Sequence, residues 1–179
     1  MKQWNQRPNL GWYARLEPGI INPMIRTSTS FILFLLSTAM VPAREKQVVQ
    51  PKEFATGRPF SPGILANGTL YVAGQIGQDL KTGKMAANFD DEVKLTLENI
   101  GVILKEAGYD YKDAVSVTVY LTDIALFNRM NAVYVPFFPE PRPVRATVAV
   151  AKLVGTAQIE ISVTAWKDPK GGGKKKAKK

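Results

Sequence analysis

The chain has 179 residues, of which 45% are hydrophobic, and it contains neither cysteine nor histidine. A hydrophobic fraction of this size can bury the core of one domain. The missing residue types exclude disulfides, thiolate nucleophiles, histidine-based triads and zinc sites built on His or Cys. No clustered acidic loop offers a cation site, so we expect no metal. Catalysis, if present, must rest on carboxylates, arginine, hydroxyls and backbone groups.

The net charge of +9 is concentrated at the two ends of the chain. Residues 1–43 carry a net +3 and residues 170–179 a net +6, which leaves residues 44–169 neutral. A nucleic-acid-binding fold usually has basic residues on one face of its body. We therefore expect no stable nucleic-acid partner for the body, and a flexible lysine-rich tail over residues 169–179.

The first 43 residues differ in composition from the rest. Residues 1–23 are polar and rich in Pro, Gly and Asn, which predicts a disordered extension. Arg26, a short apolar run and the sequence Val41-Pro42-Ala43 resemble a signal peptide over residues 24–43, with translation starting at Met24. This interpretation implies export to the periplasm or outside the cell. The alternative is an uncleaved helix or membrane anchor on a cytoplasmic protein.

The predicted folded domain spans residues 44–168 and begins with short strands. Val48-Val49 is a strand candidate, and residues 64–66 and 69–73 form a hairpin around Asn67-Gly68, a pair that tolerates positive φ at both positions. An amphipathic helix is predicted over residues 90–107. Its apolar stripe consists of Val93, Leu97, Ile100 and Leu104.

The second half alternates strands and a helix. Residues 115–122 have a period of two, typical of a strand, and a helix follows over residues 126–135. Four prolines then force an extended lead-in to Arg145, which begins a strand that runs to Ala151, and a last strand ends near Lys167. These last two strands look like a hairpin. The order ββ-α-β-α-ββ predicts an α+β sheet with both helices on one face.

Each of the last two strands begins with a charged residue, Arg145 and Glu160. Charges beside apolar runs are unfavourable without a partner. A guanidinium binds a carboxylate through two parallel hydrogen bonds, and a glutamate can position or deprotonate a water. Backbone groups at Gly74 and Thr147 could polarise other ligand atoms. The alternative is that Arg145 is a surface or interface arginine paired with a nearby acid, and Glu160 an edge-strand charge.

A series of segments between residues 47 and 167 resembles the RidA/YjgF family in order and spacing. The segments are residues 58–63, 67–76, 97–100, 117–123, 130–134, 143–148 and 159–161. The resemblance implies a chorismate-mutase-like fold assembled as a homotrimer, with clefts between neighbouring subunits. It also implies a cofactor-free deaminase that hydrolyses reactive 2-enamine and 2-imine acids to 2-oxo acids and ammonia.

The resemblance also assigns roles by position. Arg145 matches the arginine that holds the substrate carboxylate, and Glu160 matches the acid assigned to the hydrolytic water. Gly74 and Thr147 match positions that meet the ligand through backbone atoms.

Two further positions belong to the implied substrate site. Asn131 lies in the family's Asn-x-x-Tyr segment, and Phe60 stands where a pocket tyrosine is usual, so a hydroxyl contact is lost there. We expect the cleft to need Phe60 and Gly74 for closure, and Arg145 and Glu160 to meet across a subunit boundary.

Two other functions stay open. Single-stranded RNA cleavage or binding is attached to the family's older name, endoribonuclease L-PSP, and the lysine tail would add attraction to phosphates. The same cleft could instead bind small carboxylates without turnover. Export would also separate the protein from the cytoplasmic dehydratases that produce the enamines.

Overall fold

The structure is a computed structural model that describes residues 45–169. The strands are β1 (Gln47–Val49), β2 (Gly63–Ala66), β3 (Thr69–Gln75), β4 (Ala114–Leu121), β5 (Val144–Ala149) and β6 (Ile159–Trp166). The helices are α1 (Phe89–Glu106) and α2 (Phe127–Tyr134), and short 3-10 turns flank α2 and precede β4. The predicted disordered extension, signal peptide and lysine tail lie outside the described residues and stay predictions. Between residues 45 and 169, no helix is long and apolar enough to cross a membrane.

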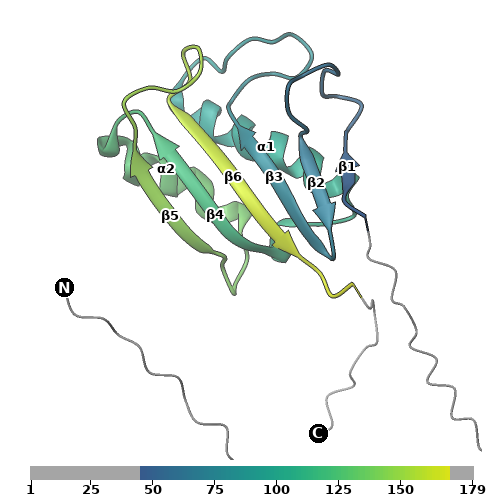
Figure 1. Ribbon diagram of the computed structural model, residues 1–179. Coiled ribbons are helices and arrows are strands. Elements are labelled where there is room, and N and C mark those ends of the chain that lie inside the picture. The colour runs from purple at the N-terminus through teal and green to yellow at the C-terminus, as the bar shows by residue number, and fades with distance from the viewer. Residues whose placement is uncertain (1–44, 170–179) are drawn as a thin grey trace, which may run out of the picture. The chain divides into compact units, whose positions relative to one another are not determined.

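The six strands form one mixed sheet in the order β1-β2-β3-β6-β4-β5 (Figure 1). The predicted hairpin between the last two strands is wrong, because β4 lies between β5 and β6. Strand β4 pairs parallel with β5 and antiparallel with β6. A parallel pair needs a long crossover connection, and α2 with its flanking turns supplies it. Strand β6 then returns to the middle of the sheet, beside β3.

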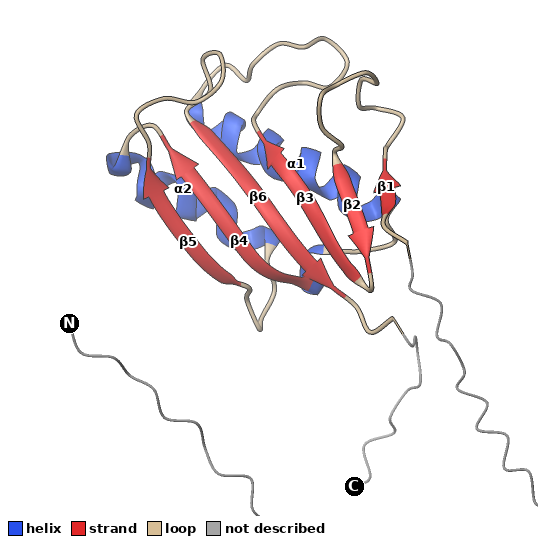
Figure 2. Ribbon diagram, in the orientation of Figure 1, coloured by secondary structure: helices blue, strands red, loops and turns tan. Residues whose placement is uncertain are grey.

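Both helices cover the same face of the sheet, as Figure 2 shows, so the predicted α+β architecture is confirmed. Strand β6 turns Ile159, Ile161 and Val163 toward the helices, and all three are buried. Helix α1 contributes the predicted apolar stripe, whose four residues are at most 1% exposed. The alternate residues of β6 and the apolar stripe of α1 therefore pack together in one core.

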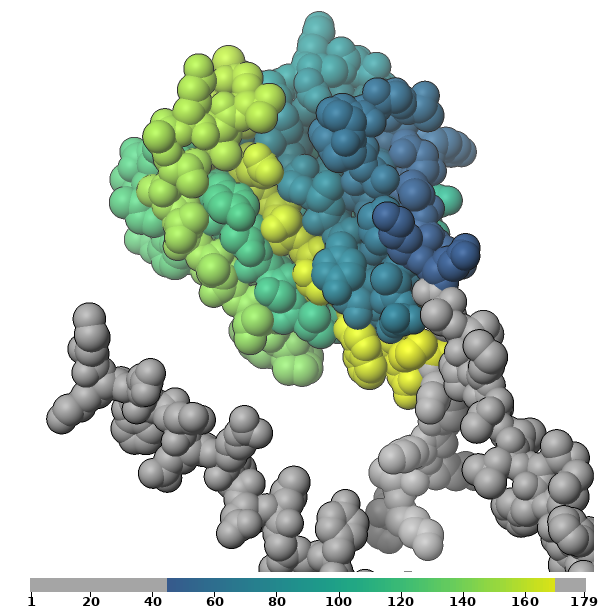
Figure 3. Space-filling model, viewed as in Figure 1, coloured from purple at the N-terminus to yellow at the C-terminus, as the bar shows by residue number. Residues whose placement is uncertain are grey.

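The opposite face of the sheet is uncovered in a single chain (Figure 3). Large apolar side chains lie exposed on it, among them Tyr71, Val148 and Trp166, which are 54%, 45% and 49% exposed. Apolar side chains gathered on one uncovered sheet face are typical of an interaction surface.

The predicted hairpin between β2 and β3 is confirmed. Its two turn residues, Asn67 and Gly68, have φ values of 49° and 77°, the left-handed conformation that a tight hairpin turn requires. This turn sets the register of β3 against β2. Gly74, near the end of β3, belongs to the candidate site.

Candidate functional site

The pairing of β3 with β6 is interrupted by a bulge between Val72 and Gln75. The Gln75 side chain is buried, and its Nε2 donates to the Ala73 carbonyl at 3.0 Å, which stabilises the irregular backbone. Gly74 lies in this bulge against Glu160: a Cβ built on Gly74 would lie 2.8 Å from the Glu160 carboxyl carbon. The absence of a side chain at residue 74 therefore leaves room for the carboxylate.

Glu160 and Gly74 line a half-open cavity of about 400 Å³. The loop between β1 and β2 and the segment after β3 complete its wall. The lining residues are Arg58, Phe60, Ala73, Gly74, Gln75, Ile76, Gln78, Leu80, Asn99, Val154 and Glu160. A cavity of this size accommodates a small organic ligand.

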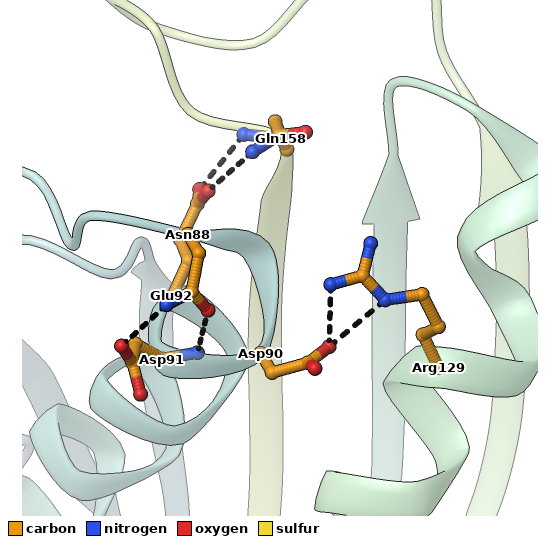
Figure 4. Close-up of polar contacts among 6 residues, drawn as sticks. All are labelled: Asn88, Asp90, Asp91, Glu92, Arg129 and Gln158. Atoms are coloured by element: carbon orange, nitrogen blue, oxygen red, sulfur yellow. Dashed lines mark hydrogen bonds and ion pairs between the residues drawn. The ribbon is translucent and has the colours of Figure 1, made fainter.

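The start of β6 is fixed by a buried carboxylate on α1. Glu92 is 2% exposed, and its Oε1 accepts hydrogen bonds from the backbone N–H of Gln158 at 2.7 Å and of Ile159 at 3.3 Å. Its Oε2 accepts from Gln158 Nε2 at 3.2 Å (Figure 4). Glu160 follows directly in the chain, so Glu92 determines where the strand that carries Glu160 begins.

A second buried polar side chain of α1 fixes the segment after β3, which forms part of the cavity wall. Asn99 is 4% exposed, and its Nδ2 donates to the carbonyls of Ile76 at 3.1 Å and Gln78 at 2.9 Å. Sequence reasoning gave Asn99 no role of its own and counted Glu92 only among the acidic residues that suit the N-terminal end of the helix. The signal was their position: residues 92 and 99 adjoin the apolar stripe of α1, on the side that packs on the sheet.

Arg145 lies on β5 at the edge of the sheet and points to the helix-covered face. It is paired with the buried Val117, and its Cζ lies 4.6 Å from the ring centroid of Tyr134 and 5.5 Å from that of Phe127. Burial raises the pKa of Tyr134, and the charge of Arg145 opposes this rise. Within the described residues Arg145 makes no ion pair. Its guanidinium lies against two aromatic rings, which leaves N–H groups that can donate to an external carboxylate.

Asn131 and Arg145 line a shallow depression together. The other residues of this depression are Tyr134, Val135, Arg142 and Pro143. Thr147, two residues beyond Arg145, faces the same side of the sheet, and its Oγ1 is buried without a hydrogen-bond partner among the described residues. A buried hydroxyl without a partner is uncommon in a folded protein.

A single chain does not bring Arg145 and Glu160 into one pocket. Arg145 is paired with Val117 and Glu160 with Tyr120, so the two lie two strands and three register positions apart. These offsets correspond to roughly 10 Å across the sheet and about 10 Å along it. The two side chains also point to opposite faces. Phe60 and Gly74 line the same cavity as Glu160. Asn131 lines the depression of Arg145, and Thr147 lies beside Arg145 on β5.

Residues 45–169 contain no group of three acidic side chains placed to hold a metal ion. The polar groups at the two pockets are a carboxylate, guanidinium groups, side-chain amides, the Tyr134 phenol and backbone atoms.

Comparison with known proteins places these features in a family. The sequence profile described as "Endoribonuclease L-PSP" matches residues 50–167. The human protein named 2-iminobutanoate/2-iminopropanoate deaminase is 39% identical over 112 residues, which are 62% of this chain and 82% of that protein. The chloroplastic Reactive Intermediate Deaminase A of Arabidopsis thaliana is 36% identical over 131 residues, 73% of this chain and 70% of that protein.

Solved structures share the fold. RidA from an Antarctic Psychrobacter species has a TM-score of 0.64 at 33% identity and covers 67% of this chain and 98% of its own. Escherichia coli TdcF with bound serine has a TM-score of 0.64 at 30% identity and covers 68% of this chain and 98% of its own.

Proposed function

Because the chain belongs to the endoribonuclease L-PSP family, of which RidA is a member, we propose that it hydrolyses 2-imino acids, and the 2-enamines that tautomerise to them, to 2-oxo acids and ammonia. The main support for this reaction is the position of the Glu160 carboxylate, which lies over the Gly74 backbone in a half-open cavity. The deaminase names of the human and plant relatives support this reaction. The serine bound to TdcF supports a small carboxylate as ligand.

The reaction requires Arg145 and Glu160 in one cleft, so we propose that the protein works as a homotrimer. In this assembly Arg145 of one copy faces the Glu160 cavity of the next. The support is the exposed apolar surface on the open face of the sheet and the position of Arg145 on the edge strand. Burial of this surface would provide the driving force for association.

The proposed chemistry begins with binding of the substrate carboxylate to the Arg145 guanidinium through two parallel hydrogen bonds. Glu160 accepts a proton from a water as the water oxygen bonds to the carbon of the protonated imine, which gives a neutral carbinolamine. The protonated Glu160 then donates this proton to the nitrogen. As the C–N bond breaks and ammonia leaves, the Glu160 carboxylate accepts the hydroxyl proton of the carbinolamine, so that the former water oxygen becomes the carbonyl of the 2-oxo acid, and Glu160 releases this proton to solvent.

The test is ammonia release from imino acids generated in situ by an amino-acid dehydratase. Arg145→Ala should lower kcat/KM by on the order of 30-fold or more, because a bidentate charged contact contributes roughly 2–4 kcal/mol. Glu160→Gln should lower kcat with little effect on KM. Arg129→Ala is the matched control, since Arg129 pairs with Asp90 on the surface at 3.1 Å. Equal rates for wild type and Arg145→Ala would remove Arg145 from the mechanism.

The family's description as an endoribonuclease raises RNA cleavage as a second candidate. Residues 44–169 carry no net charge, so net attraction to phosphates would have to come from the ends of the chain, chiefly from residues 170–179 with their net +6. Deletion of residues 170–179 should then abolish salt-sensitive binding of single-stranded RNA. Cleavage that survives this deletion and is lost in Glu160→Gln would instead favour a ribonuclease at the Glu160 cavity.

A further inference from the structure

Arg58 is a second guanidinium at the Glu160 cavity, and the proposed deaminase chemistry does not use it. It lies in the loop between β1 and β2 and lines the cavity together with Phe60 and Glu160. Its Cζ lies 5.9 Å from the ring centroids of both Phe54 and Phe60. Phe54 is buried, at 3% exposure, so one of the two rings that hold Arg58 is anchored in the core.

The charge of Arg58 is not neutralised by the fold. Across residues 45–169 its guanidinium makes no ion pair, whereas Arg129 and Arg142 each pair with a carboxylate. A guanidinium positioned by aromatic rings keeps its fork of N–H donors available for an anion. Arg58 is therefore a candidate anion-binding group in the lining of the cavity.

The cavity is also larger than a three- or four-carbon imino acid requires. About 400 Å³ accommodates a substrate with an extended side chain. In the proposed reaction, Arg145 of a neighbouring copy binds the α-carboxylate and Glu160 deprotonates the water that attacks the imine carbon. The side chain of the substrate would then occupy the rest of this cavity. Arg58 is the positively charged residue of the lining, and it would stabilise a negative charge at the end of that side chain.

We propose that Arg58 binds a second carboxylate, so that the protein prefers 2-imino acids with an acidic side chain over those with an apolar one. This inference rests on the proposed function for the placement of the α-carboxylate at Arg145. The role of Arg58 is specificity: it contacts the substrate side chain and takes no part in bond making.

The test compares binding of two 2-oxo acids with the same five-carbon chain, 2-oxoglutarate and 2-oxopentanoate, to the full-length protein by calorimetry. Wild type should bind the dicarboxylate more tightly by on the order of 10-fold, the contribution of one charge-assisted pair. Arg58→Gln should remove this preference, and Arg58→Lys should keep part of it. The control Arg129→Gln should leave the preference unchanged.

Several outcomes would overturn the inference. They are equal affinity of wild type for the two ligands, no binding of either ligand, or a preference that persists in Arg58→Gln. A fall in oligomeric mass of Arg58→Gln with unchanged ligand preference would assign Arg58 to a contact between copies. The proposed deaminase is judged separately by ammonia release, because calorimetry with 2-oxo acids requires no turnover.

Discussion

The backbone of Gly74 lies directly under the carboxylate of Glu160. A Cβ built at residue 74 overlaps Oε1 of Glu160 and lies 2.8 Å from its carboxyl carbon and 3.1 Å from its Cγ. Real Cβ atoms do not approach other atoms this closely, so a side chain at residue 74 and the observed position of Glu160 exclude each other. This relationship joins two residues that sequence reasoning selected separately.

Gly74→Ala should therefore displace the Glu160 carboxylate and lower ammonia release by on the order of 100-fold or more, since small misplacements of a catalytic group have effects of this size. The steric origin can be isolated by a double-mutant cycle measured by ammonia release. In the Glu160→Ala background, Gly74→Ala should lower the rate by a much smaller factor than in wild type, because no carboxylate is left to displace. Equal factors in the two backgrounds would contradict this account.

Glu92 provides the next prediction, because its buried carboxylate accepts from two backbone N–H groups and one side-chain amide. Glu92→Leu leaves these donors without an acceptor, and each donor that stays buried costs about 1–3 kcal/mol of folding stability. We expect a loss of roughly 2–4 kcal/mol in the free energy of unfolding. Glu92→Gln keeps an acceptor and should lose less.

The matched control for Glu92 is Glu98→Leu, since Glu98 is a half-exposed glutamate on the same helix, 3.8 Å from Lys94. This exposed pair should contribute less than about 1 kcal/mol. Urea midpoints of the variants test the difference. Similar losses for Glu92→Leu and Glu98→Leu would mean that the start of β6 does not depend on the buried carboxylate.

Most of the local structure could be predicted from the sequence. Helix α1 has an apolar stripe with a helical period, acidic residues in its first turn and Gly108 after its end, and it lies within one residue of its predicted limits. The hairpin at Asn67-Gly68 depends on two residues that take positive φ. Such features are encoded by neighbouring residues, so no knowledge of distant segments is needed.

The relations between distant segments could not be predicted in the same way. The insertion of β6 between β3 and β4 depends on which strands pair across the whole chain, and the alternation of β6 fits either neighbour equally well. Glu92 and Asn99 are polar residues on a helix, where a solvent-exposed position is the usual expectation. Their position beside the apolar stripe signals burial, but their hydrogen-bond partners became evident only with the backbone groups of residues 76, 78, 158 and 159 in place.

Thr147 supplies a prediction of increased stability. Its Oγ1 is buried and lacks a hydrogen-bond partner among the described residues, and valine has nearly the same shape without the hydroxyl. Thr147→Val should raise the free energy of unfolding by about 1 kcal/mol, because an unsatisfied buried hydroxyl is unfavourable and valine suits a strand. Thr118→Val, on the open face of β4, is the control and should gain less. A loss of stability in Thr147→Val would show that the hydroxyl has a partner in the assembled protein.

Tyr111 should make stability depend on pH in the alkaline range. Its hydroxyl donates to the Leu97 carbonyl at 2.7 Å, and burial, followed by the nearby charges of Glu98 and Asp110, raises its pKa to about 12. The unfolded chain loses this proton near pH 10 and the folded protein only near pH 12, so between these values the folded state binds more protons. The stabilisation is complete below pH 10 and is lost as the pH rises toward 12. Urea midpoints measured across this range should fall more steeply for wild type than for Tyr111→Phe, and parallel curves would contradict the assignment.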